Sequence, residues 1–116
     1  MAFDTSVLDR AQARQRAQWE EERQALLKRL LRLLDELVDG FDLHQVYIFG
    51  SLVQPGHFTK FSDVDVAIVG LPDEQFFKFS AALSSALGRD VDLIELDSCH
   101  FAGKIRSEGL LWTPSG

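Results

Sequence analysis

The sequence predicts an α/β fold with a small mixed sheet flanked by helices and a long helix at the N-terminus. Three observations lead to this fold class. Between Asp4 and Asp39 there is no Gly or Pro, and strong helix formers fill the segment. Short apolar runs follow, separated by polar loops. A second helical pattern lies between two of these runs, giving the order helix, strand, loop, strand, helix, strand, helix.

The first helix is expected from about Thr5 to Val38. Thr5 or Ser6 can cap its start, and Gly40 lies just past its end. Its second half has a broad apolar face that is suited to cover a sheet. This face is formed by Leu26, Leu27, Leu30, Leu31, Leu33, Leu34, Leu37 and Val38.

The first half of this helix, up to Arg23, is polar and carries only a thin apolar stripe. The stripe consists of Val7, Leu8, Ala11 and Trp19. At ~1.5 Å rise per residue the whole helix is on the order of 50 Å long, which exceeds the width of a small domain. We therefore divide the chain into a helix (1–40), whose first half is an arm for self-association or a partner, and a core (41–116). The alternative is that the arm folds back or frays.

The remaining elements follow from apolar runs and turn residues. Strands are expected at His44–Phe49, Asp63–Val69 and Val91–Leu96. A loop containing Pro55 and Gly56 separates the first two, from Val53 to Phe61.

A second helix is expected from Asp73, as its cap, to Leu87, with Gly88 ending it. Its expected buried side is Phe76, Phe77, Phe79, Leu83 and Leu87. A short helix at Ser98–Ser107 and a final strand or apolar lid within Gly109–Gly116 complete the chain.

Composition restricts the class of protein. The 116 residues form one ordinary domain, with 46% hydrophobic and 26% charged residues. No apolar run approaches the ~20 residues of a membrane span, and the start lacks a signal pattern. The single Cys99 cannot form an internal disulfide, which agrees with a reducing compartment, so a cytoplasmic protein is expected. We interpret Cys99 and His100 as structural residues. The net charge of −6 argues against general nucleic-acid binding.

Two carboxylates stand two positions apart at the start of the second strand. In a strand, residues i and i+2 point to one face, so Asp63 and Asp65 are expected to lie together. Their repulsion needs an offset, and a divalent cation such as Mg²⁺ binds carboxylate oxygen and substrate phosphate. Gly50 and Ser51 follow the first strand and expose backbone N–H groups suited to an anion. The pattern indicates a site for a metal-bound nucleoside triphosphate.

These motifs carry a family resemblance. Phe49-Gly50-Ser51, a polar loop, Ser62-Asp63-Val64-Asp65, and Gly-Arg-Asp-Val-Asp-Leu-Ile at 88–94 resemble the signature of the nucleotidyltransferase superfamily of DNA polymerase beta. The short chain is most similar to its minimal nucleotidyltransferases (MNT). The match covers roughly Val46 to Asp97.

The resemblance implies an enzyme that transfers a nucleoside monophosphate, here AMP from ATP, to a hydroxyl, with release of pyrophosphate. Two Mg²⁺ ions would stabilise the attacking and leaving oxygens. Asp63 and Asp65 would ligate both ions, and Asp92 would ligate the catalytic ion. Gly50 and Ser51 would hold the β- and γ-phosphates. Asp90 remains an alternative to Asp92 for the third carboxylate.

The Gly-Ser loop departs from the family pattern. Many minimal members have Gly-Ser-Arg-x-Arg-Gly, whereas this chain has Gly-Ser-Leu-Val-Gln-Pro-Gly and lacks both arginines. Those arginines would hold triphosphate charge. Lys60 and His57 lie in the same loop and are candidates to replace them, Lys60 as a nucleotide-binding residue.

Larger transferases of this superfamily add a helical domain that binds the acceptor, and we expect none here, since about twenty residues follow the third expected strand. Minimal nucleotidyltransferases commonly resemble the antitoxin half of a two-gene system with a helical HEPN toxin. The resemblance implies AMP transfer to such a partner. The alternative is a binding module that neutralises a HEPN-like protein by contact, with little or no catalysis. Modification of an aminoglycoside or other small molecule is a third reading, disfavoured by the missing substrate domain.

Overall fold

The structure, a computed structural model, describes residues 5–115. It has three helices, four strands and two short 3₁₀ segments in this range. They are α1 (Ser6–Leu37), β1 (Gln45–Phe49), η1 (Gly50–Val53), β2 (Val64–Val69), α2 (Asp73–Leu87), β3 (Val91–Glu95), η2 (Leu96–Ser98), α3 (Ala102–Glu108) and β4 (Leu110–Trp112). The order confirms the expected α/β succession. Of the expected C-terminal tail, Gly116 lies outside the described residues.

The four strands form one mixed sheet with the order β3-β2-β1-β4. Strand β1 is antiparallel to β2 and β4, whereas β2 and β3 are parallel. The carboxyl end of β1 therefore meets the amino ends of β2 and β3 at one edge of the sheet. Phe49 pairs with Asp65, and Asp65 pairs with Asp92. We call this side the carboxylate edge.

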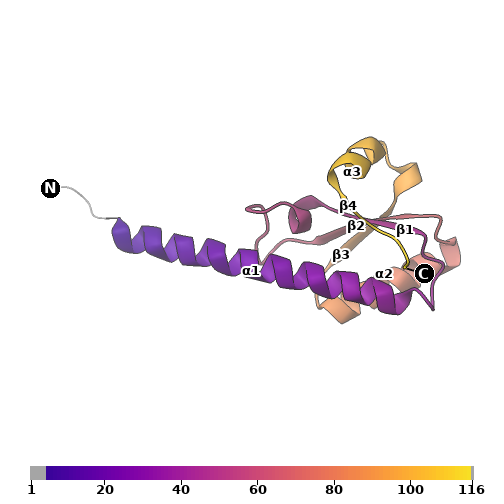
Figure 1. Cartoon of the computed structure of the whole chain (residues 1–116), viewed down its shortest axis with the longest axis horizontal. Helices are drawn as coiled ribbons and strands as arrows, with labels where there is room; N and C mark the ends of the chain where they lie inside the picture. Colours follow the sequence, from indigo (N-terminus) through magenta and orange to yellow (C-terminus); the bar gives the residue numbers. More distant parts are fainter. Residues whose placement is uncertain (1–4, 116) are drawn as a thin grey trace.

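Helices cover both faces of the sheet (Figure 1). On one face, alternate residues of β1 and β2 pack in the main core with α1 and α2. This core includes Leu30, Leu34, Val46, Ile48, Val64, Val66, Ile68, Phe79 and Leu83. On the other face, Tyr47 and Ala67 pack with Ile105 of α3 and Leu96. Because side chains alternate along β2, Asp65 shares the α3 face with Ala67.

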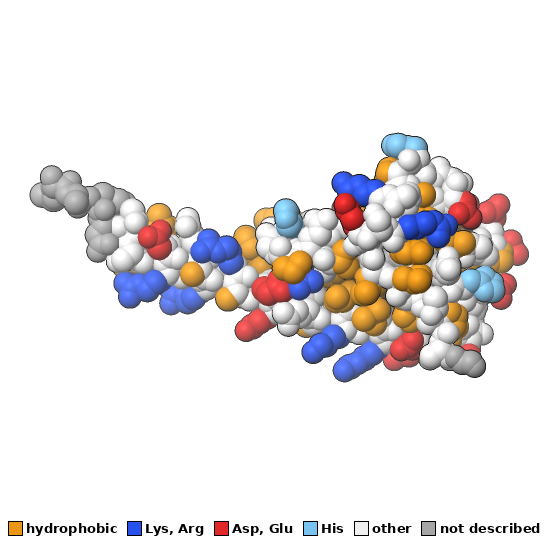
Figure 2. Space-filling model, turned by 45° about the horizontal axis from the view of Figure 1, so that its top comes forward, with side chains coloured by type: hydrophobic (Ala, Val, Ile, Leu, Met, Phe, Trp, Pro, Cys, Tyr) orange, Lys and Arg blue, Asp and Glu red, His pale blue; other side chains and the backbone are white. Residues whose placement is uncertain are grey.

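Helix α1 packs on the core only through its second half. Its buried residues are Arg23, Leu26, Leu30 and Leu34, and the first half projects beyond the sheet (Figure 1). The molecule is consequently 65 Å long and only 28 by 25 Å across. We call the projecting part, residues 5–19, the arm. Basic side chains lie along its length (Figure 2). Thr5 occupies the N-cap position, but its hydroxyl donates to Asp9 Oδ2 and caps no backbone N–H.

The expected buried side of α2 is wrong at Phe77, which is 80% exposed. Phe79, Leu83 and Leu87 are buried at helical spacing, and Phe76 is half-buried beside them. Phe77 lies about 100° around the helix from Phe76 and cannot share this face. The cap is also different, since Pro72 holds the N-cap position and Asp73 is the first helical residue. In the first turn, the negative charge of Asp73 interacts favourably with the helix dipole, although Asp73 does not cap the helix.

Other boundaries shift by a few residues. Strand β2 begins at Val64, so Asp63 precedes it, and β3 ends at Glu95 because Leu96 turns into η2. The last helix spans Ala102–Glu108, later than expected, and the C-terminal apolar residues form a strand, β4.

No helix within residues 5–115 is long and apolar enough to cross a membrane.

The different environments of two phenylalanines in α2 give a matched stability prediction. Phe79 is fully buried and meets the Phe41 ring edge-on, with centroids 5.3 Å apart. We expect Phe79→Ala to lower the free energy of unfolding by about 3–5 kcal/mol through lost burial and a cavity. We expect Phe77→Ala to change it by less than ~0.5 kcal/mol. Urea denaturation of the two variants checks this, and equal losses would contradict the described packing.

Candidate functional site at the carboxylate edge

Three aspartates gather where β2 and β3 begin. Asp65 is the second residue of β2 and is half-buried, and Asp92 is its partner in β3. Asp63 lies just before β2 and is exposed. The Val64 N–H donates to the Asp90 carbonyl at 3.0 Å, which fixes the alignment of the two strands at this edge. The three sequence-predicted carboxylates are thus carried by one edge of the sheet.

The electrostatics of Asp65 reflect this crowding. Burial first, and then the negative charges of Asp92 and Asp63, together raise the pKa of Asp65 to about 6. Asp92 and Asp63 are the acids that raise this pKa, which favours Asp92 over Asp90 as the third carboxylate. Ionisation of Asp65 is therefore less favourable than that of an ordinary exposed aspartate, and a nearby positive charge would favour it.

The donor chemistry fits a divalent cation, although residues 5–115 hold no preformed cluster of metal ligands. Within the described residues, no three His, Cys, Asp or Glu side chains converge closely enough to hold a metal ion. Mg²⁺ usually retains waters and is bound through one or two carboxylates together with substrate phosphates. Asp65 and its neighbours match that kind of open site better than a closed, all-protein cage.

The Gly-Ser turn lies directly against Asp65. Gly50 has a φ of +74°, a conformation that L side chains rarely adopt. A Cβ at this position would collide with Oδ2 of Asp65. Glycine therefore allows the backbone of η1 to approach the carboxylate. Gly50 and Asp65, predicted separately from the sequence, are neighbours in the structure.

A buried arginine holds this turn to α1. Arg23 is 8% exposed, and its Nη1 donates to the Leu52 carbonyl at 2.9 Å. Its Nε and Nη2 donate to Glu20 at 2.9 and 2.6 Å. The hydrogen bond from Arg23 lowers the pKa of Glu20 to about 2, with a smaller contribution from Gln24. The sequence analysis missed Arg23, although one arginine on the same helix face as Leu26, Leu30 and Leu34 was a visible signal.

Lys60 and Gly50 line different hollows. The first hollow, about 180 Å³, lies between η1 and α3 and is lined by Phe49, Gly50, Phe101, Lys104 and Glu108, among others. Lys60 lines a groove beside Asp63 and Asp90, and its ammonium lies 5.0 Å from the centre of the Phe61 ring. Lys104 of α3, which the sequence analysis did not single out, is therefore the lysine that shares a hollow with Gly50. His57 is exposed.

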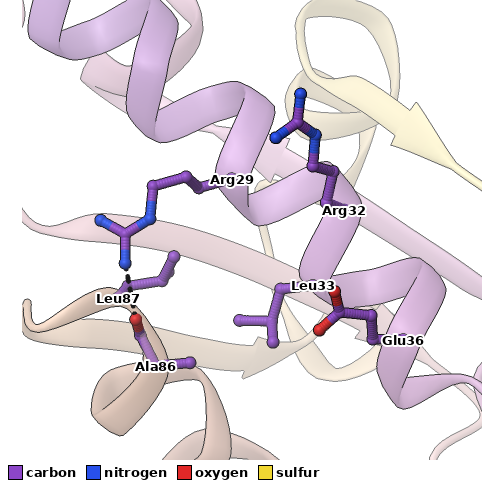
Figure 3. Close-up of a pocket in the computed structure, with 6 residues that line it drawn as sticks. All are labelled: Arg29, Arg32, Leu33, Glu36, Ala86 and Leu87. Atoms are coloured by element: carbon purple, nitrogen blue, oxygen red, sulfur yellow. Dashed lines mark hydrogen bonds between the residues drawn. The ribbon is translucent and has the colours of Figure 1, made fainter.

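A further hollow lies between α1 and α2, away from the aspartates (Figure 3). Arg29 donates across it to the Ala86 carbonyl at 2.7 Å, and Arg32 and Glu36 border it. Arg29 thereby satisfies a carbonyl in the last turn of α2. We interpret this hollow as a helix–helix contact.

Comparison with known proteins identifies the family. Residues 18–112 match the family described as polymerase beta, nucleotidyltransferase. The match spans most of the chain, so this protein belongs to that family, and the resemblance inferred from its motifs is confirmed. No curated protein sequence matches the chain.

Solved structures with a similar fold agree with this family. A chain of a toxin–antitoxin crystal structure with AMP-PNP is 26% identical, with a TM-score of 0.56, covering 76% of this chain and 73% of that one. A second match is a chain of a structure described as a tri-AMPylated Shewanella oneidensis HEPN toxin in complex with MNT antitoxin. It is 23% identical, has a TM-score of 0.53 and covers 80% of this chain and 73% of that one. At 23% identity, this second match shows similarity of fold alone.

The raised pKa of Asp65 predicts a pH-dependent stability. The folded-state pKa of about 6 exceeds the ordinary 3.8, so the folded state loses stability as pH rises from below 4 through 6. Without divalent cations, Asp65→Asn should raise the free energy of unfolding at pH 7.5 by on the order of 1 kcal/mol. This expected gain is smaller than the pKa shift alone would give, because water screens the charge of a half-exposed group. The gain should vanish near pH 3.

Urea titrations across this pH range measure the effect, with Asp39→Asn as the exposed control. A gain for Asp65→Asn that persists unchanged at pH 3 would contradict the electrostatic cause.

The contact of Arg23 with Leu52 predicts that Arg23 orders the Gly-Ser turn. Arg23→Met removes the donor to the Leu52 carbonyl, so amide exchange within 50–54 should accelerate about tenfold, the worth of roughly one hydrogen bond. A convenient reporter is the Gln54 amide, which donates to the Ser51 carbonyl at 3.2 Å. Arg14→Met, an exposed change on the same helix, should leave this exchange unaltered. Hydrogen exchange measured by NMR tests this prediction. Equal exchange rates at 50–54 in the two variants would refute the role of Arg23 in ordering the turn.

Proposed function

We propose that this protein is a Mg²⁺-dependent nucleotidyltransferase that transfers AMP from ATP to a hydroxyl of a partner protein. The observation that carries the proposal is the approach of Gly50 to Asp65 beside Asp92 and Asp63. The first backbone N–H groups of a helical turn have no partner within the turn. Such a turn beside a cluster of repelling carboxylates suits a triphosphate with its cations. The family membership supports the same chemistry.

Each residue has a distinct role in this mechanism. Gly50 and Ser51 bind the β- and γ-phosphates through the turn, and Lys104 and Lys60 are candidates to offset phosphate charge from either side. Asp63 and Asp65 are the proposed ligands of two Mg²⁺ ions, and Asp92 is the ligand next to the nucleophile. Bound Mg²⁺ supplies Lewis-acid stabilisation of the attacking and leaving oxygens.

The transfer step exchanges one phosphorus–oxygen bond for another. The acceptor hydroxyl oxygen bonds to the α-phosphorus while the bond to the bridging oxygen of pyrophosphate breaks. Pyrophosphate leaves with that electron pair, and the hydroxyl proton passes to Asp92 or to water beside it. Asp92 is exposed in β3, so the proton has a path to solvent.

The partner we propose is a HEPN-like helical protein, with this chain in the antitoxin role in the cytoplasm. Support comes from the described complex of an AMPylated HEPN toxin with an MNT antitoxin and from the arm of α1. The arm carries the basic residues Arg10, Arg14 and Arg16 and the acidic residue Asp9, and Val7 and Leu8 are exposed. It is a surface for a partner chain or for a second copy of this protein.

A binding module without catalysis is the second candidate. The Gly-Ser loop lacks the family's two arginines, and no preformed metal cluster occurs within residues 5–115. In that case the carboxylate edge would be dispensable, and neutralisation of the partner would depend on contact alone.

Calorimetric titration of ATP tests the proposal. We expect binding that requires Mg²⁺ and that weakens at least tenfold when Asp63→Asn and Asp65→Asn are combined. An Asp39→Asn, Glu74→Gln double variant keeps the same charge change at exposed sites and should bind as the wild type does. Pyrophosphate release should likewise fall in the Asp63/Asp65 double variant and stay at the wild-type level in the exposed-site control. Binding unaffected by the Asp63/Asp65 change would remove the nucleotide from this edge and favour the binding module.

A further inference from the structure

The arm of α1 lies almost entirely outside the segment that matches the nucleotidyltransferase family. That match begins at residue 18, whereas the arm spans residues 5–19 and projects beyond the sheet (Figure 1). Most helices in proteins are stabilised by packing an apolar face against the rest of the fold, and the arm has no such packing on the core. The surface of the arm is therefore free to bind another molecule.

One side of the arm carries no charge. At 3.6 residues per turn, six residues of the arm fall within about 120° of the helix circumference, and the charged residues of the arm all lie outside this arc. Val7 is 70% exposed and Leu8 is 55% exposed. A neutral, partly apolar stripe between charged flanks is typical of a helix that packs on another helix. We call this side the neutral stripe, and its residues are Val7, Leu8, Ala11, Gln15, Gln18 and Trp19.

The arm is a basic segment of an acidic protein. It carries three arginines, Arg10, Arg14 and Arg16, and one acidic residue, Asp9, whereas the whole chain has a net charge of −6. Among residues 5–115, no carboxylate forms an ion pair with these arginines. Uncompensated charges beside an apolar stripe favour a ligand of opposite charge.

The fold limits how far a second helix can extend along the neutral stripe. The same side of α1 continues at Glu22 and Ala25, by the spacing of three and four residues that places side chains on one helix face. Leu87 and Arg89, at the end of α2, line a hollow together with these two residues. The end of α2 therefore occupies this side of α1 from about residue 22 onward, and a docked helix has room only along the arm.

This limit disfavours a second copy of the chain as the ligand. If two arms overlap fully in antiparallel orientation, Arg10 of one chain lies opposite Arg14 of the other. If they overlap in parallel orientation, Arg10 lies opposite Arg10 of the other chain. Facing like charges destabilise a helix pair in both cases. A longer overlap that brought the arginines to Glu21 of the second copy would run into the end of α2.

We propose that the neutral stripe binds an amphipathic helix of a different protein, with apolar side chains at its centre and acidic side chains on its flanks. The apolar side chains cover Val7 and Leu8, and the acids pair with the three arginines. The phosphate backbone of a nucleic acid would meet the arginines but would leave this apolar surface uncovered. The inference rests on the partner role proposed above, specifies the chemistry of the partner, and does not require nucleotidyl transfer.

The first test uses a designed helix as the probe, without nucleotide or metal. A fluorescent, acetylated peptide of about three heptads has Leu at positions a and d and Glu at positions e and g. Fluorescence anisotropy measures its binding to the full chain. The same peptide with Lys at e and g should bind at least tenfold more weakly, and added salt should weaken binding of the Glu peptide.

Charge reversal on the arm provides the second test. A triple variant of the arm's arginines should bind the Glu peptide at least tenfold more weakly than the wild type. A control with the same charge change at exposed sites outside the arm should bind as the wild type does. The arm variant is Arg10→Glu, Arg14→Glu, Arg16→Glu, and the control is Lys28→Glu, Arg32→Glu, Lys78→Glu.

The neutral stripe itself is tested by a matched pair of double variants. Val7→Ser with Leu8→Ser should weaken binding of the Glu peptide severalfold. Ala13→Ser with Ala17→Ser places the same residues on the opposite side of the helix and should leave binding unchanged. Circular dichroism reports whether α1 stays helical in each variant.

Three results would overturn the proposal. The first is absence of binding to the Glu peptide, and the second is equal binding of the Glu and Lys peptides or of the two triple variants. The third is a dimer, measured by light scattering, that dissociates in the Val7/Leu8 variant, because a second copy would then cover the stripe. We expect a monomer.

Nucleotide binding fails or succeeds independently of this surface. The triple variant of the arm should keep Mg²⁺-dependent ATP binding. Peptide binding without any ATP binding would remove nucleotidyl transfer and retain the partner surface. ATP binding without peptide binding would remove the partner surface and retain the carboxylate edge.

Discussion

The placement of Asp65 beside Asp92, on adjacent parallel strands, constrains the rest of this molecule. Both side chains lie on the α3 face, and the antiparallel partner β1 brings Gly50 against the same carboxylate. The pairing of β2 with β3 therefore brings like charges together, which costs stability when they are ionised. The apolar core on the opposite face, centred on Val64, Val66 and Phe79, offsets that cost.

Two arginines hold the loops at this edge in place. Arg23 bonds to the carbonyl of Leu52 from α1, and Arg89 bonds to the carbonyl of Ser62 from the turn after α2. Each reaches across from an element packed on the core to a loop next to an aspartate. The loop departs from the family's arginine pattern, yet its two ends are supported by arginines from other elements. Lys104 of α3 likewise supplies positive charge to the Gly50 hollow from outside the loop.

Local patterns in the sequence were enough for most of the fold and for the carboxylates. Apolar periodicity located α1, α2 and the first three strands. The expected shared face of Asp63 and Asp65 required a strand from Asp63, but β2 begins at Val64 and Asp63 precedes it. Arg23 and Lys104 were missed because their roles depend on contacts with segments distant in the sequence. Phe77 was misassigned because three phenylalanines within four positions cannot all face one core. Lys60 was grouped with Gly50 by proximity in the loop, but the loop carries it to another hollow.

Two features of the described residues stay open to solvent, the hollow beside Gly50 and the arm of α1. Within residues 5–115, η2, α3 and β4 follow β3 and cover the α3 face near Tyr47 and Ile105. The arm of α1 leaves the core next to Glu20 and Arg23, which contact the Gly-Ser turn through Leu52. A partner bound to the arm would therefore contact α1, the helix whose Arg23 orders this turn. Partner docking and nucleotide binding would then be coupled through one buried arginine, without movement of the sheet.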